Sequence, residues 1–192
     1  MTGTVRELWR WPVAGMGGEA MPSVRLDTRG VGGDRVHAVL REGSAEPLRT
    51  PVLARWVAGY PFNIGANVDP AAPPLALATA PDGRTFVWND PWLRCALEKA
   101  LGQPIRLRRD LHGLQMVERT VLVTWGELDP RALRANLHLD LDGGVGEPGT
   151  VLSFDGGVRL RVLGPCKAGG AYARVLSHGR IAAGAAVELV GP

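Results

Sequence analysis

The chain has 192 residues, of which 45% are hydrophobic and 21% are charged, and its formal net charge is +3 at pH 7. This composition excludes a disordered chain, and the length suffices to bury a core without disulfide or metal cross-links. Only two of the 22 basic residues are lysines, but no basic run with interleaved aromatic residues marks a nucleic-acid interface, so we expect no nucleic-acid partner.

Two cysteines are too few for the disulfide framework of a small secreted protein. The first residues, MTGTVRELWRWPV, lack the basic start, apolar run and cleavage site of a signal peptide. No apolar stretch approaches the roughly 20 residues that cross a bilayer. We therefore expect a cytoplasmic protein with free thiols and no membrane partner.

Short apolar runs with period-two alternation or β-branched residues predict strands along the whole chain. In chain order they occupy residues 4–11, 23–27, 35–41, 75–80, 84–88, 120–125, 136–142, 150–154, 158–164 and 185–191. The segments Pro81-Asp82-Gly83 and Asp155-Gly156-Gly157 each predict a tight turn between two of these strands.

Two Asp-Pro pairs predict the starts of helices, because aspartate caps a helix and proline is tolerated in its first turn. The clearer helix runs from Pro91 to Leu101, and a shorter one follows Asp129. The expected apolar face of the helix from Pro91 to Leu101 consists of Trp92, Ala96, Leu97, Ala100 and Leu101, with Cys95 buried at the flank. Many short strands and one or two short helices predict a mainly β, β-barrel-rich fold.

The stretch VLGPCKAGG places Cys166 at the end of a strand, where a glycine-rich loop opens. The neighbouring Lys167 favours the thiolate, which is both a nucleophile and a soft metal ligand. A half-buried thiol without a function explains the residue equally well at this point.

Two further patterns have plainer explanations. RGVGGDR, ending at Arg35, could bring backbone amides to a phosphate, but a glycine-rich turn explains it when it is taken alone. His138, Asp140 and Asp142 alternate with leucines, so we expect them on a solvated strand face rather than around a metal.

Taken in chain order, these segments resemble the MOSC family, named for the C-terminal domain of the molybdenum cofactor sulfurases. The similar segments are VRELWRWPVAGMGGE, GVGGDRVHAVL, LRTPVLA, ALEKALGQPIRL, VERTVLVTWGELDPRALRAN, VLGPCKAGG and GRIAAGAAVELVG. The resemblance implies an N-terminal β-barrel-like half over residues 1–112 and a core with the cysteine loop over residues 113–192, together one compact unit.

The resemblance also implies a basic pocket with Cys166 at its lip. Cys166 would be the catalytic residue and the ligand of molybdenum in a pterin cofactor, and Arg35, Arg134, Asn136 and Thr124 would bind that cofactor. Pyridoxal phosphate is not expected, because it belongs to the other domain of the sulfurases.

Two hypotheses follow from the resemblance. In the first, the protein is an oxidoreductase that reduces N-hydroxylated small molecules and receives electrons from a separate protein. In the second, Cys166 carries sulfur as a persulfide from a sulfur donor, or the pocket binds another small anion without metal. The chain differs from the family at Ala14, where a phosphate-binding lysine is usual, and at Gly169, where some members have a second cysteine.

Overall fold

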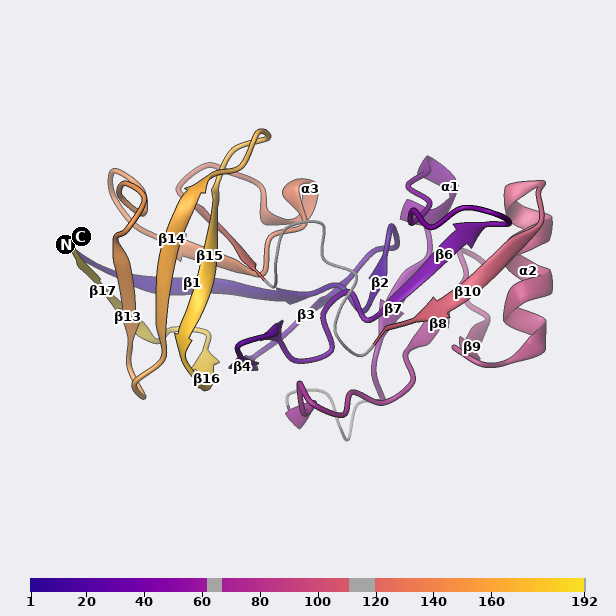
Figure 1. Ribbon diagram of the computed structural model, residues 1–192, viewed down its shortest axis with the longest axis horizontal. Helices are drawn as coiled ribbons and strands as arrows, with labels where there is room; N and C mark the ends of the chain where they lie inside the picture. The colour runs from indigo at the N-terminus through magenta and orange to yellow at the C-terminus, as the bar shows by residue number, and fades with distance from the viewer. Residues whose placement is uncertain (62–66, 111–119, 192) are drawn as a thin grey trace.

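The computed structural model describes residues 1–61, 67–110 and 120–191, and most of its regular structure is strand (Figure 1). Strands that are distant in sequence form a closed barrel, because β1 pairs with β12 on one side and with β17 on the other. The ring consists of β1 (Thr2–Arg10), β12 (Leu137–Asp140), β11 (Val121–Trp125), β15 (Ala171–Ser177), β14 (Arg159–Pro165), β13 (Val151–Phe154) and β17 (Ala186–Val190). The predicted mainly β fold is confirmed.

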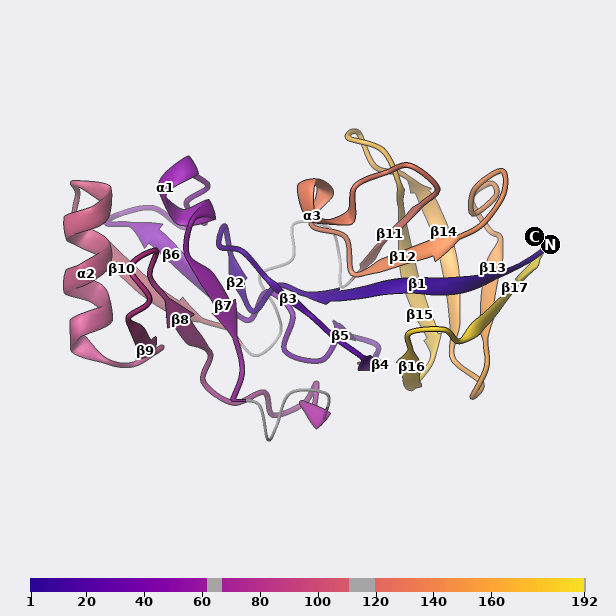
Figure 2. The ribbon, with the colours of Figure 1, turned by 180° about the vertical axis from the view of Figure 1, so that it is seen from behind.

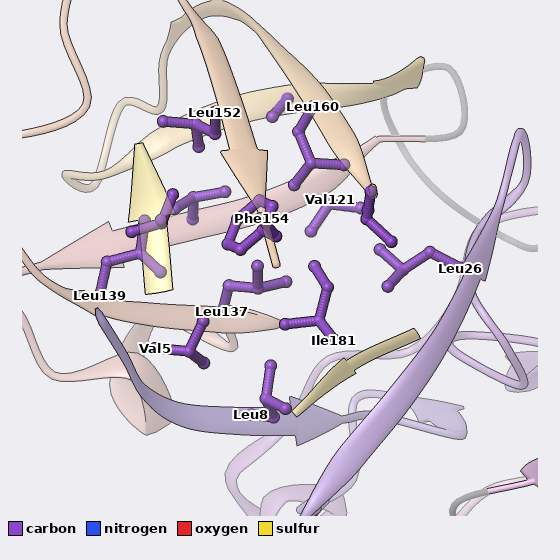
Figure 3. Close-up of a cluster of buried hydrophobic side chains, with 14 of the residues drawn as sticks. Val5, Leu8, Leu26, Val121, Leu137, Leu139, Leu152, Phe154, Leu160 and Ile181 are labelled. Carbon is purple, nitrogen blue, oxygen red and sulfur yellow. The ribbon is translucent and has the colours of Figure 1, made fainter. Parts of the chain in front are cut away.

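The barrel encloses a core of aliphatic side chains with one methionine and one phenylalanine (Figure 3). Inward residues alternate with outward ones along each strand, as on β14, where Leu160 and Val162 are buried between exposed neighbours. Leu26 of β4 (Ser23–Asp27) and Ile181 of β16 (Gly179–Ala182) also pack into this core. The β4–β16 pair, extended by β5 (Gly30–Val31), therefore closes part of the barrel.

A second core lies in the half that Figures 1 and 2 show beside the barrel. Leu93 and Leu97 of helix α2 (Pro91–Leu101) pack there with residues of two small sheets. One sheet contains β10 (Ile105–Arg109), β6 (His37–Arg41) and β2 (Val13–Ala14), and the other contains β7 (Val57–Gly59), β8 (Leu77–Thr79) and β9 (Thr85–Val87). The predicted Pro-Asp-Gly hairpin is the β8–β9 pair.

The long strand β1 joins the two cores, because it runs through the barrel and leads through Trp11 and Pro12 into β2 (Figures 1 and 2). Its end also pairs with β3 (Glu19–Ala20). A strand of the predicted N-terminal half thus completes the barrel of the C-terminal half. The predicted boundary between residues 112 and 113 lies outside the described residues.

Helix α2 (Pro91–Leu101) begins and ends as predicted: Asp90 accepts a hydrogen bond from the Trp92 amide, and Gly102 ends the helix in a left-handed conformation. Its predicted apolar face was right at Leu97, which is buried, and at Ala96 and Leu101, which pack against the second core, but wrong at the remaining positions. Trp92 is 73% exposed and Cys95 is exposed, whereas Leu93 and Leu97 are the buried pair. The side of α2 that meets the sheets is centred on these two leucines, which are one turn apart.

The short helix after Asp129 is α3 (Pro130–Leu133), and an unpredicted short helix, α1 (Pro51–Ala54), begins after Thr50. The prediction that His138 faces solvent was wrong, because its side chain is buried and its Nδ1 lies 3.0 Å from Oγ1 of Thr124 on the neighbouring strand. The Thr124 hydroxyl therefore gives the imidazole ring of His138 a hydrogen-bond partner on the outer side of the barrel.

Candidate functional site

A cavity of about 230 Å³ lies between the outer surface of the barrel and the loops of the other half. Its walls come from the β1–β2 connection, the segments before β6 and α1, the end of α3 and the cysteine loop between β14 and β15. The residues that line it are Trp11, Val13, Ala14, Gly15, Arg35, Arg49, Thr120, Leu122, Leu133, Arg134, Cys166, Ala168 and Tyr172.

The barrel contributes the cavity wall through the outward positions of two paired strands. Leu122 of β11 and Tyr172 of β15 are directly opposite each other in the antiparallel register. Their neighbours Val121, Val123 and Ala173 are buried in the barrel core. Because side chains alternate between the two faces of a strand, the same residues that build the core orient the wall of the cavity.

Arg35 is held at the cavity by interactions on both sides of its guanidinium group. Its Nη1 donates to Asp34 at 2.6 Å, and its Nη2 donates to the backbone carbonyl of Arg134 at 2.6 Å. Asp34 is buried and also accepts from the Trp11 amide. Burial raises the pKa of Asp34, and the neighbouring charge of Arg35 opposes that rise.

Arg134 ends helix α3, and its Nη2 donates to the backbone carbonyl of Gly15 at 2.8 Å. Burial, and then the guanidinium groups of Arg49 and Arg35, lower the pKa of Arg134. Within the described ranges, neither Arg49 nor Arg134 forms an ion pair with a carboxylate. The cavity therefore concentrates positive charge that an anionic ligand would neutralise.

Arg35 and Arg134 also have an unusual backbone conformation. Arg35 (φ 50°) and Arg134 (φ 54°) are the two non-glycine residues with positive φ in the part of the chain that the structure describes. The left-handed conformation costs an L-residue about 1–2 kcal/mol. Such strain is concentrated at functional sites, where the surrounding structure maintains it. Here it is found at two arginines of one cavity.

Cys166 lies at the rim of the cavity in a tight loop. Its amide donates to the carbonyl of Gly170 at 2.9 Å, and its carbonyl accepts from the Gly169 amide at 3.0 Å. Gly170 has φ 79°, and a Cβ there would lie 2.6 Å from the carbonyl oxygen of Val123. Only glycine fits this position, so the loop is pressed against the barrel and the thiol has a defined place.

The sulfur of Cys166 contacts one hydroxyl group. Sγ lies 3.5 Å from the hydroxyl of Tyr172, to which the thiol donates. The hydrogen bond with Cys166 raises the pKa of Tyr172, with burial as the next cause. The phenol therefore remains protonated at neutral pH and is available as a donor to a sulfur anion.

The structure brings Arg35, Arg134 and Cys166 to one cavity, although about a hundred residues or more separate Arg35 from the other two. Asn136 lies behind the wall, where its side chain accepts from Leu122 N and Arg35 Nη1. Thr124 is not among the described residues that line the cavity, and its hydroxyl lies next to the His138 ring instead.

Two residues of the cavity, Arg49 and Tyr172, were not predicted as site residues from the sequence. Arg49 lies directly before Thr50 and Pro51, a recognisable helix start that could have marked it as the last residue of a loop. Tyr172 lies six residues after Cys166 on the returning strand. Only the pairing of β15 with β14 and β11 shows that its side chain reaches the thiol.

Residues 1–61, 67–110 and 120–191 contain no group of three or more His, Cys, Asp or Glu side chains that could hold a metal ion. In the same residues, no helix is both long and apolar enough to span a membrane.

No protein-family model and no curated protein matches this chain. Among solved structures, the chain is similar to the YuaD protein from Bacillus subtilis. The two share 13% sequence identity with a TM-score of 0.49, over 98% of this chain and 96% of that one.

Proposed function

We propose that the cavity binds the phosphate-bearing pterin cofactor of molybdenum, and that Cys166 supplies a thiolate ligand to the metal. The observation that carries the proposal is the presence of two strained arginines, Arg35 and Arg134, at the same cavity as a positioned cysteine. Maintaining two costly backbone conformations is explained if their guanidinium groups must present a fixed surface to a ligand.

The donor set fits such a group. Guanidinium groups form paired, charge-assisted hydrogen bonds with phosphate, and a soft thiolate suits molybdenum better than hard oxygen ligands do. Arg134 and Arg49 would hold the phosphate, because Arg35 is already paired with Asp34 and would orient the ligand. When bound, the cofactor would supply the two-electron chemistry that reduces an N-hydroxylated small molecule.

Arg49 also offers an explanation for Ala14. Ala14 lines the cavity but has no cation to offer, and Arg49 lies on the same cavity with an exposed side chain. We infer that Arg49 replaces the missing lysine in binding the phosphate. Because an exposed arginine loses side-chain entropy when it binds, retention of the cofactor should be weaker than with a buried cation at position 14.

One observation favours a second function, in which Cys166 carries a persulfide and no metal is bound. The Tyr172 hydroxyl at 3.5 Å could donate to a sulfur anion and stabilise it without any metal. Either function requires a further protein, because the chain would need a source of electrons or of sulfur. The donor could be a separate electron-transfer protein or a sulfur-transfer protein.

The proposal is tested by expressing the protein in a host that makes molybdenum cofactor and measuring bound molybdenum and pterin. We expect both in the parent, more in Ala14→Lys, neither in Arg134→Ala, and pterin with little metal in Cys166→Ser. Arg55→Ala, an exposed arginine outside the cavity, is the matched control and should equal the parent.

If the parent and Ala14→Lys both lack molybdenum and pterin, the cofactor proposal fails. Intact mass spectrometry of the same samples then decides the second function. A mass increase of one sulfur atom that disappears in Cys166→Ser would support the persulfide, and its absence would exclude both.

A further inference from the structure

The hairpin that carries Cys166 has an unusual charge. Between Gly156 and His178 the sequence contains Arg159, Arg161, Lys167 and Arg174 and no aspartate or glutamate. These four positive charges exceed the net charge of +3 for the whole chain. The rest of the protein is therefore negative in sum, and the positive charge is concentrated on β14, the cysteine loop and β15.

The arginines of this hairpin lie on its outer face. On β14, Arg159, Arg161 and Leu163 are exposed and alternate with buried residues, and on β15 Arg174 and Leu176 do the same. We call these five residues the hairpin face. Arg161 and Arg174 are direct partners in the antiparallel register. Together with Arg159, they place three positive charges on one outer face of the sheet.

The hairpin face is continuous with the thiol. Tyr172 precedes Arg174 by two residues on β15, so both side chains point outward, about 7 Å apart along the strand. Tyr172 contacts Cys166, and Lys167 is exposed beside it. A molecule bound on the arginines would thus border the rim of the cavity.

We propose that the hairpin face is the docking surface for an acidic patch of a partner protein that delivers electrons or sulfur to Cys166. The proposal rests on the proposed function, which makes Cys166 the reactive group. Charge complementarity supplies attraction and orientation. The exposed side chains of Leu163 and Leu176, each 37% accessible, favour a protein over a nucleic acid, because apolar side chains find partners on a protein surface and not on a phosphate backbone.

The test uses the rate at which an acidic thiol-reactive peptide reaches Cys166. The probe is a glutamate-rich peptide with two leucines and one cysteine activated as a 2-pyridyl disulfide, and its comparison peptide has lysine for each glutamate. The Cys166 thiolate attacks the peptide sulfur, a new disulfide forms, and the pyridine thiolate that leaves takes up a proton and is measured by absorbance. All proteins carry Cys95→Ser, because Cys95 is exposed and would react as well.

At low ionic strength we expect the acidic peptide to react at least about tenfold faster than the basic one, with the ratio falling as salt is added. Arg159→Glu/Arg161→Glu should reduce the ratio to near one. Arg55→Glu/Lys99→Glu changes the net charge equally at an exposed site in the other half and should preserve it. Thermal unfolding confirms that each variant is folded.

Equal rates for the two peptides with the parent would overturn the proposal, as would an equal loss of the ratio in the control variant. Suppression by duplex DNA or by phosphatidylglycerol vesicles, at charge concentrations where polyglutamate has no effect, would assign the face to another partner and also overturn it. The ratio of the two peptide rates does not depend on whether the protein binds the cofactor. If no molybdenum or persulfide is found, the rate ratio still reports the docking surface.

Discussion

At the scale of single residues, the backbone conformation of Arg134 separates stability from function. Arg134 has φ 54° and ends helix α3 at the position where glycine is usually found. Glycine would adopt this conformation without strain, so an arginine at this position implies that the guanidinium group has a role that outweighs the strain. Binding of a ligand by the guanidinium group would be such a role.

The variants Arg134→Gly and Arg134→Ala differ in their backbone strain at this position. Both remove the guanidinium group and should lose cofactor binding, but only glycine relieves the left-handed strain. We expect Arg134→Gly to be more stable than Arg134→Ala by about 1 kcal/mol in urea unfolding. Equal stability of the two variants would mean that position 134 does not keep this conformation in solution.

The two thiols differ in a way that the sequence did not reveal. A buried Cys95, as the helix pattern predicts, would make Cys166 the faster of the two thiols to be alkylated. That premise was wrong, since Cys95 is exposed and Cys166 is only half-buried. A simple comparison of their rates therefore no longer identifies the functional thiol.

Protection of a thiol by a bound anion would identify the functional cysteine. Millimolar pyrophosphate should slow the reaction of iodoacetamide with Cys166 severalfold and leave Cys95 unchanged, because the anion would occupy the arginine cavity beside Cys166 only. Peptide mass spectrometry reads both sites in one sample. Protection of both thiols, or of neither, would contradict an anion site at this cavity.

At the scale of elements, strand β6 buries a histidine in the second core. His37 is fully buried, its Nδ1 lies 3.3 Å from the Pro12 carbonyl, and its ring packs edge-on against Trp88. In the described part of the chain, its Nε2 is the buried side-chain atom that lacks a hydrogen-bond partner. Burial lowers the pKa of His37 from 6.5 to about 4.

A consequence is loss of stability in mild acid. Between pH 6.5 and 4 the unfolded chain binds a proton at His37 and the folded protein does not, so the free energy of unfolding falls as the pH falls through this window. The loss approaches roughly 3 kcal/mol at pH 4. In His37→Phe, urea unfolding at several pH values should show a smaller decline over the same window. A decline of unchanged size would assign it to other groups.

At the scale of the whole molecule, β1 couples the two cores. Its residues Val5 and Leu8 are buried in the barrel, and the chain continues directly into β2, where Val13 is buried in the second core. The cavity lies along this connection, where Trp11, Val13 and Ala14 form part of its wall. Separation of the two halves would therefore dismantle the site.

We expect the halves to unfold together. Leu137→Ala in the barrel and Leu97→Ala in the second core should each lower stability by about 2–5 kcal/mol. Each should shift one common transition, detected by circular dichroism and by tryptophan fluorescence. Two separate transitions, each moved by only one of the substitutions, would show that β1 does not couple the cores.

Local features of this protein were determined by the sequence alone. The strand at 23–27, the hairpin turn at 81–83 and helix Pro91–Leu101 lie where alternation, turn residues and caps predict them. These features depend on neighbours within a few residues, so the printed order of residues contains the required information.

Only the tertiary structure decided which faces meet. Closure of β1 against β12 and β17 joins residues more than a hundred positions apart, and a local pattern cannot specify such a pairing. The same long-range packing exposed Cys95, buried His138 and brought Arg49 and Tyr172 to the cavity. Periodicity shows that a strand or helix has two faces, but the partner that covers a face is known only when the chain has folded.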